Sequence, residues 1–162
     1  MLKVNRKIFI IAVIVLCLDH IVKSIISAIL KVGESINIIP NFFSLTYIQN
    51  QGAAWGIFSN KPVIIIITTA IAALIIYKFM YSFKTNFRNN LAFGLVIGGL
   101  LGNLIDRLIF GYVRDFFDFQ IFNYNYPVFN ISDIAIVIGV FLLIYAIIKG
   151  EDKHANNSKK QQ

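Results

Sequence analysis

The chain has 162 residues, 57% of them hydrophobic, and a formal net charge of +7. This length favours a single domain, and so apolar a composition excludes an ordinary soluble domain and indicates a membrane protein. The positive charge does not indicate a nucleic-acid partner, because most basic residues lie beside apolar segments. Cys17 is the only cysteine, which excludes a disulfide framework.

Four apolar segments are each long enough to cross about 30 Å of hydrocarbon as a helix. Their approximate bounds are 8–30, 62–81, 91–110 and 131–148. The first segment has a basic start, as a signal peptide does. It also contains Asp19, His20 and Lys23, and no small-residue cleavage site follows it. We therefore interpret it as a retained span.

Four spans place both termini on the same side of a membrane, and clusters of basic residues predict that this side is the cytoplasm. These residues are Lys3, Arg6, Lys7, Lys78, Lys84, Arg88, Lys149, Lys153, Lys159 and Lys160. The connections 31–61 and 111–130 then face outward. We predict a four-span domain over 1–150 and a polar cytoplasmic tail over 151–162.

The first outer connection contains a run rich in Ile, Phe, Thr and Tyr over 36–49, with a turn signal at Pro40-Asn41. This pattern predicts a β-hairpin or small sheet, an outer β-cradle over about 33–49. Residues 50–60 mix small side chains with Trp55 and Phe58. They suit either a turn with a short interfacial helix or a loop that faces a substrate.

The second outer connection, 111–130, is dense in Phe and Tyr. So aromatic a patch is a liability in water. We predict a loop that lies at the membrane interface or covers a site.

Five aspartates occur before the tail, and this topology places all of them near the outer face. They are Asp19, Asp106, Asp115, Asp118 and Asp133. Ionisable side chains at membrane depth are costly and rarely face lipid. Their common depth therefore predicts a functional site.

Several polar residues in the spans allow both a structural and a functional interpretation. Asp19 and Lys23 share a helix face and form either an internal ion pair or a pair whose lysine extends outward to a substrate or headgroup. Gly98 and Gly102 permit close helix packing. Asn103, Asp106 and Arg107 form either a polar helix end or part of a site.

Asp115 and Asp133 are the candidate catalytic pair. Asn130 and Asp133 also have the spacing of a helix N-cap and its N3 acid, which is a sufficient structural reason for both. If the two carboxylates meet, they share one proton, and one can activate water while the other polarises a carbonyl. The only histidines are His20 and His154, so we expect neither a metal site nor a cofactor.

Two other functions remain open at this point. An ion or proton carrier, with Asp19, Lys23 and Asp106 as its relay, requires acids across the full membrane depth, and the inner halves of the spans have none. A non-enzymatic assembly subunit requires that the acids only hold helices together.

Five short motifs, in order along the chain, resemble those of the lipoprotein signal peptidase family, also called type II signal peptidases. They are D-x-x-x-K at Asp19–Lys23, N-x-G-A-A at Asn50–Ala54, G-N-x-x-D-R at Gly102–Arg107, V-x-D-F at Val113–Phe116 and F-N-x-x-D at Phe129–Asp133. The resemblance covers about residues 8–148.

The resemblance implies an aspartic endopeptidase of the bacterial cytoplasmic membrane. Such enzymes remove the signal peptide from prolipoproteins whose lipobox cysteine carries diacylglycerol, cutting just before that cysteine. The implied fold is four transmembrane helices with a small extracytoplasmic β-cradle and a short interfacial helix. We expect a monomer surrounded by phospholipid, with its active site near the outer face.

The resemblance also assigns roles to individual residues. Asp115 and Asp133 correspond to the catalytic dyad, and Asn130 orients it. The residues that shape, line or support the site are Asp19, Lys23, Asn50, Gly52, Asn103, Asp106 and Arg107.

The chain departs from the family pattern at three positions. His20 stands where glutamine is usual, Ser132 where alanine is usual, and Arg114 where an apolar residue is common. Ser132 is small enough to fit, and its hydroxyl can tune Asp133. Arg114 can depress the pKa of Asp115 by its charge, but we predict that it points to lipid headgroups instead. We interpret His20 as an interfacial residue that points away from Asp19 and Lys23, or as a weak hydrogen-bond donor.

Overall fold

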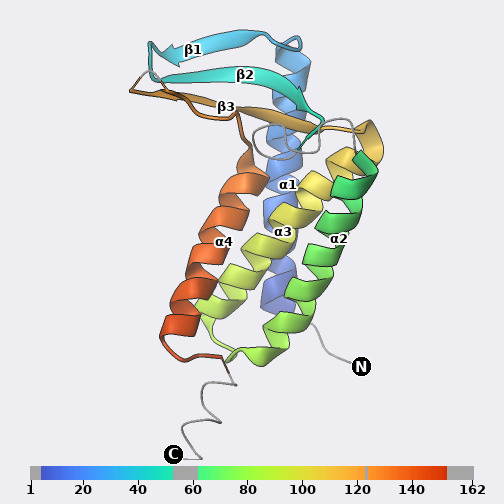
Figure 1. Cartoon of the computed structure of the whole chain (residues 1–162), viewed down its shortest axis with the longest axis vertical. Helices are drawn as coiled ribbons and strands as arrows, with labels where there is room; N and C mark the ends of the chain where they lie inside the picture. Colours follow the sequence, from blue (N-terminus) through green and yellow to red (C-terminus); the bar gives the residue numbers. More distant parts are fainter. Residues whose placement is uncertain (1–4, 53–61, 123, 153–162) are drawn as a thin grey trace, which may run out of the picture.

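Four long helices run side by side and make up most of the computed structural model, which describes residues 5–52, 62–122 and 124–152 (Figure 1). The helices are α1 (Arg6–Ile29), α2 (Pro62–Phe79), α3 (Phe87–Phe110) and α4 (Ile131–Ile148). Each is long and apolar enough to cross a membrane, with α2 continued by the 3-10 turn η2 (Met80–Ser82). The four predicted spans are thus confirmed as helices.

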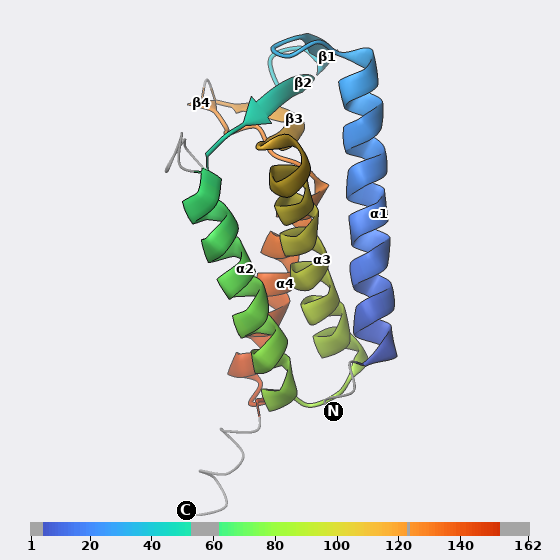
Figure 2. The ribbon, with the colours of Figure 1, turned by 90° about the vertical axis from the view of Figure 1, so that its right-hand side faces the viewer.

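The helices begin and end where the sequence supplies caps. Asn5, Asn86 and Asn130 are N-caps whose side chains accept hydrogen bonds from the first turns of α1, α3 and α4. Helix α3 ends at Gly111, whose φ of 80° is a left-handed conformation that glycine adopts without strain. The start of α1 and the end of α4 lie at the same end of the bundle (Figures 1 and 2).

Helix α3 is the centre of the bundle and packs against all three other helices. Its glycines allow close approach: a Cβ at Gly98 would lie 2.8 Å from the carbonyl oxygen of Ala12, and one at Gly102 would lie 2.9 Å from Oδ2 of Asp19. The predicted role of Gly98 and Gly102 is therefore confirmed. As a result, polar side chains of α1 reach polar side chains of α3.

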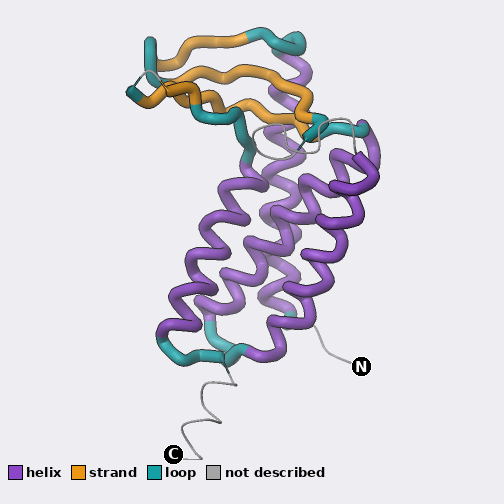
Figure 3. Tube along the Cα trace, in the orientation of Figure 1, coloured by secondary structure: helices purple, strands orange, loops and turns teal. Residues whose placement is uncertain are grey.

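A four-stranded antiparallel sheet lies across the other end of the bundle (Figure 3). Its strands, in spatial order, are β1 (Ser35–Ile39), β2 (Phe43–Asn50), β3 (Val113–Ile121) and β4 (Tyr124–Asn125). The predicted hairpin is confirmed, and Asn41 takes a left-handed φ of 59° in its turn.

The second outer connection differs from our prediction of a loop, because most of it is the central strand β3 with the short β4. The first four residues of β3 are all buried, so both faces of the strand are covered there, and its sequence lacks the alternation that marks a half-buried strand. Phe116 is fully buried against Ile26 and Leu30 of the α1 end and Tyr47 of β2. This cluster fixes the sheet to the top of the bundle.

Two predicted features lie partly outside the described residues. The interfacial helix predicted within 50–60 is mostly in the undescribed segment 53–61. Of the predicted tail, the structure describes Glu151 and Asp152. The backbone oxygen of Glu151 accepts a 2.9 Å hydrogen bond from Lys84, and its side chain pairs with Arg88. These two residues therefore pack on the α2–α3 connection.

Candidate active site

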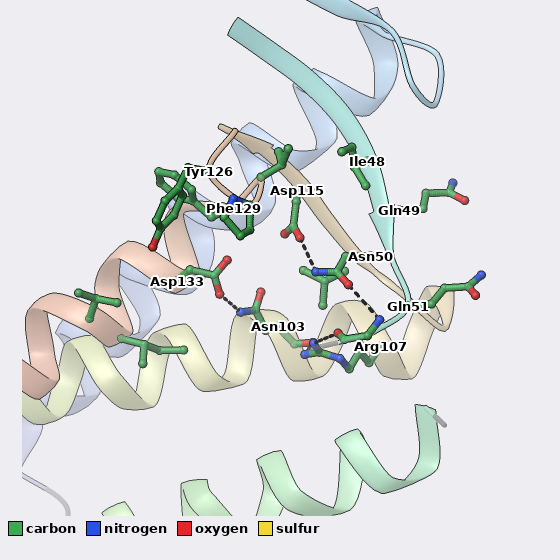
Figure 4. Close-up of a pocket in the computed structure, with 16 residues that line it drawn as sticks. Ile48, Gln49, Asn50, Gln51, Asn103, Arg107, Asp115, Tyr126, Phe129 and Asp133 are labelled. Atoms are coloured by element: carbon green, nitrogen blue, oxygen red, sulfur yellow. Dashed lines mark hydrogen bonds between the residues drawn. The ribbon is translucent and has the colours of Figure 1, made fainter. Parts of the chain in front are cut away.

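A cavity of about 740 Å³ lies between the sheet and the adjacent ends of α3 and α4. Figure 4 shows the Asp115 and Asp133 carboxylates turned toward the same space. The other lining residues are Ile48, Gln49, Asn50, Gln51, Gly52, Asn103, Arg107, Val113, Tyr126, Pro127, Val128, Phe129, Ile136 and Val137. The structure thus brings the predicted pair into one cavity.

Asp115 lies on β3 and is 2% exposed. Its Oδ2 accepts a 2.8 Å hydrogen bond from Nδ2 of Asn50, and its Oδ1 accepts one of 2.6 Å from Nδ2 of Asn130. Asp115 pairs with Ile48 across β2 and β3. Because residues two apart share a strand face, this register places Asn50 on the side of Asp115.

Asp133 lies in the first turn of α4, where it forms a capping box with Asn130. Its Oδ2 accepts from the Asn130 backbone N–H at 3.2 Å, and its own N–H donates to Asn130 Oδ1 at 3.0 Å. Its Oδ1 accepts a 2.7 Å hydrogen bond from Nδ2 of Asn103. The cap interpretation is therefore confirmed, and the same carboxylate faces the cavity.

Asn130 connects the two aspartates, because it donates to one carboxylate from its side chain and to the other from its backbone. Its Nδ2 also lies 3.1 Å from Oδ1 of Asn103. Asn130 is fully buried. Asn130 therefore helps to fix the separation of the two carboxylates.

Lys23 is fully buried behind the cavity, where its Nζ lies 2.7 Å from Oδ2 of Asp19, 3.2 Å from Oδ2 of Asp106 and 3.1 Å from Oδ1 of Asn103. An ammonium group only donates, so the Asn103 amide oxygen must face Lys23 and its Nδ2 must face Asp133. The predicted ion pair with Asp19 is confirmed. The predicted outward extension of Lys23 is wrong, because two buried carboxylates hold its charge.

The remaining predicted residues divide between the cavity wall and its support. Arg107 lines the cavity and donates from Nη2 to the Gly52 carbonyl at 3.2 Å. Asp19 and Asp106 lie behind the cavity wall with Lys23 and are fully buried. Oδ1 of Asp19 accepts a 2.9 Å hydrogen bond from the Ser132 backbone N–H, which ties α1 to the start of α4.

Two residues lie where the sequence did not place them. Arg114 is 6% exposed and donates from Nη2 to Oδ1 of Asp106 at 2.8 Å, so the prediction that it points to headgroups is wrong. His20 lies beside this ion pair, since its Nδ1 is 3.1 Å from Nη2 of Arg114. Arg114 is buried because its guanidinium pairs with the buried carboxylate of Asp106.

Comparison with known proteins assigns the chain to a family. The model of the family described as signal peptidase (SPase) II matches residues 11–149. The chain belongs to the signal peptidase II family. Lipoprotein signal peptidases of Staphylococcus aureus strains JH9 and Newman are each 41% identical to it over 140 residues, which is 86% of this chain and 86% of theirs.

Two solved structures of a bacterial membrane enzyme share the fold. Their TM-scores are 0.79 and 0.77 at 41% identity, over 88% of this chain and 87% and 92% of theirs. The resemblance found in the sequence motifs is thus confirmed over most of the chain.

The electrostatics of this signal peptidase II site favour retention of a proton. Burial, and then the negative charge of Asp133, raise the pKa of Asp115 from 3.8 to about 7. At neutral pH a proton is therefore available on Asp115 beside a second carboxylate.

This pKa predicts how stability depends on pH. Between about pH 4 and 7 the folded chain keeps a proton on Asp115 that the unfolded chain has lost, so this contribution is present at low pH and disappears as the pH rises to 7. It amounts to at most about 4 kcal/mol. Thermal unfolding in detergent at pH 5 and pH 8 should show a smaller pH dependence for Asp115→Asn than for wild type, whereas equal dependence would show that Asp115 titrates normally.

Two aromatic residues of the cavity wall, Tyr126 and Phe129, have no predicted role in the site, although Phe129 begins the last family motif. Their signal is the aromatic run 122–129, which predicts a segment at the membrane interface or over a site. No three His, Cys, Asp or Glu side chains among the described residues form a group that could hold a metal ion. The expectation of no metal and no cofactor stays a prediction.

Proposed function

We propose that this chain is a membrane aspartic endopeptidase that removes the signal peptide from diacylglyceryl-modified prolipoproteins, cutting just before the lipidated cysteine. The observation that carries the proposal is that Asp115 and Asp133 line one cavity and are both held by Asn130. Membership of a peptidase family disfavours the carrier and assembly-subunit alternatives.

The proposed reaction needs one protonated and one ionised carboxylate in the dyad, and we assign the proton to Asp115. Asp115 gives its proton to the scissile carbonyl oxygen, while ionised Asp133 removes a proton from a water molecule that attacks the carbonyl carbon. The tetrahedral intermediate then collapses: Asp133 passes the proton from water to the departing amine, Asp115 takes its proton back from the hydroxyl oxygen, and the carbon–nitrogen bond breaks. The products are the signal peptide carboxylate and the amino group of the lipidated cysteine.

The shape of the site supports a lipid-bearing substrate. An apolar groove of about 430 Å³ continues from the catalytic cavity and shares Tyr126, Phe129, Asp133 and Val137 with it. Its other lining residues are Phe119, Ile121, Ile134 and Ile138. Each methylene buried from water contributes about 0.8 kcal/mol, so acyl chains in this groove would help to hold the adjacent cysteine at the dyad.

The arrangement of charge supports an orientation in the bacterial cytoplasmic membrane. The described basic residues Arg6, Lys7, Lys84, Arg88 and Lys149 lie at or near the helix ends opposite the sheet. By the positive-inside rule, that end is cytoplasmic, with both termini, and the sheet and active site lie near the outer face. We propose that the protein works there as a monomer in contact with phospholipid.

The deciding experiment compares two substrates with purified protein in detergent. Wild type should cut a lipobox peptide with a diacylglyceryl cysteine and leave the unlipidated peptide intact, while Asp133→Asn should cut neither. If folded wild type is as inert as Asp133→Asn on the lipidated peptide, the proposed function is wrong and the assembly-subunit alternative gains.

A further inference from the structure

Arg114 connects three elements beside the proposed catalytic strand. It lies on β3, immediately before Asp115. Its Nη2 and Nε lie 2.8 and 3.2 Å from Oδ1 of Asp106 on α3, and its Nη1 lies 3.4 Å from Oγ of Ser24 on α1. The guanidinium carbon stands 4.6 Å from the ring centre of Phe110. The N–H groups of the Arg114 guanidinium therefore have hydrogen-bond partners on two helices, and the Phe110 ring packs against the guanidinium.

Asp106 holds the backbone of Arg114 as well as its side chain. The Arg114 N–H donates to Oδ2 of Asp106 at 3.0 Å. One fully buried carboxylate thus fixes both the start of β3 and the direction of its arginine. Since successive residues of a strand point to opposite faces, fixing Arg114 toward the bundle turns Asp115 toward the cavity.

His20 completes this arrangement as a hydrogen-bond acceptor. Arginine has donors and no acceptor, so Nδ1 of His20, 3.1 Å from Nη2 of Arg114, must accept, and the ring proton must be on Nε2. Nδ1 of His20 also lies 3.7 Å from Oδ1 of Asp106, so the three side chains of Arg114, Asp106 and His20 meet at one point.

We propose that Arg114, clamped by Asp106 and His20, is a positioning residue that sets the location of Asp115 relative to Asp133. This inference rests on the proposed function. Arg114 does not line the catalytic cavity, so it acts through the strand and not on the substrate. Lysine cannot replace it fully, because an ammonium group lacks the planar fork that meets Asp106, His20 and Ser24 together.

The test measures kcat and KM separately on the diacylglyceryl peptide for Arg114→Lys and Arg114→Val. Misplacement of a reacting group by about 1 Å can cost about 100-fold in rate. We expect kcat to fall about 100-fold in Arg114→Val and about tenfold in Arg114→Lys, with KM within about twofold of wild type. A kcat of Arg114→Lys within twofold of wild type would overturn the proposal, as would an effect on KM alone.

Matched variants at His20 keep the test decisive if Arg114→Val does not fold. Glutamine can accept the arginine hydrogen bond through Oε1, and leucine cannot. His20→Gln should therefore keep kcat near wild type while His20→Leu loses about tenfold, and equal rates in the two would count against the clamp.

A second readout is independent of turnover. The free energy of unfolding should change with pH near pH 7, where Asp115 titrates. If Arg114 positions Asp115, the midpoint of this change should lie at lower pH in Arg114→Lys and at the wild-type pH in His20→Gln. If wild type does not cleave the peptide, and the midpoint shifts in Arg114→Lys but not in His20→Gln, the proposed function is refuted and the positioning role stands. An active wild type with unshifted midpoints and rates would refute only the positioning role.

Discussion

Asp115→Asn should give a folded protein that cleaves the diacylglyceryl peptide about 10²–10⁴-fold more slowly than wild type, because a positioned acid or base contributes a factor of this size. Asparagine occupies nearly the same volume and can donate a hydrogen bond to the scissile carbonyl. It cannot carry the proton that passes through the dyad during the reaction. The loss should therefore appear in kcat, measured by product formation under saturating peptide.

Asp118→Asn is the matched control, since Asp118 lies on the same strand three residues later. Its Oδ2 accepts a 2.6 Å hydrogen bond from Oγ1 of Thr46, and it does not line the catalytic cavity. Its kcat should stay within about twofold of wild type. If Asp115→Asn kept more than a tenth of wild-type kcat, or if both variants lost activity equally, Asp115 would not be the catalytic group.

Lys23→Met should lower the free energy of unfolding by about 3–5 kcal/mol, as expected when one member of a buried ion pair is removed. Methionine fills similar space but leaves Asp19 without its ammonium partner and Asp106 with Arg114 as its remaining cation. It also removes one of the three side-chain hydrogen bonds that orient the Asn103 amide toward Asp133, so activity should fall with stability. Thermal unfolding in detergent measures the first effect, and peptide cleavage measures the second.

Two further variants separate charge from packing in this prediction. The double variant Lys23→Met with Asp19→Asn removes both members of the closest pair and should recover part of the lost stability. Lys31→Met changes an exposed lysine and should leave stability within about 0.5 kcal/mol of wild type. If the double variant were no more stable than Lys23→Met, the uncompensated charge of Asp19 would not be the cause.

The helices and the hairpin could be predicted from the sequence because their signals are local. A predominantly apolar run of sufficient length has few alternatives to a membrane helix, and Pro40-Asn41 between β-rich stretches indicates a turn. The meeting of Asp115 and Asp133 is different. It depends on Asn130, Asn50 and the pairing of β2 with β3, so it could be expected only from the family resemblance.

The errors concern residues whose surroundings come from distant parts of the chain. Strand β3 was predicted as a loop, because a strand buried on both faces shows no alternation. Arg114 was assigned to the membrane surface, because its contacts with Ser24 and His20 cross 90 or more positions of the chain, and the turn that returns it to Asp106, eight residues earlier, was not predicted. The two alternatives for Lys23, an internal ion pair or an outward extension, stayed open for the same reason: its contacts with Asp106 and Asn103 cross 80 or more positions of the chain.

The pairing of α1 with α3 has a consequence for biosynthesis. Helix α3 is the least hydrophobic of the four candidate spans and carries Asp106, which is costly to place alone in lipid. Helix α1, which carries Lys23, is synthesised first. We therefore expect α1 to be inserted in the membrane already and to pack against α3 when α3 leaves the translocation machinery. Asp133 arrives only with the last span, and the nascent chain should therefore remain without proteolytic activity until its insertion is complete.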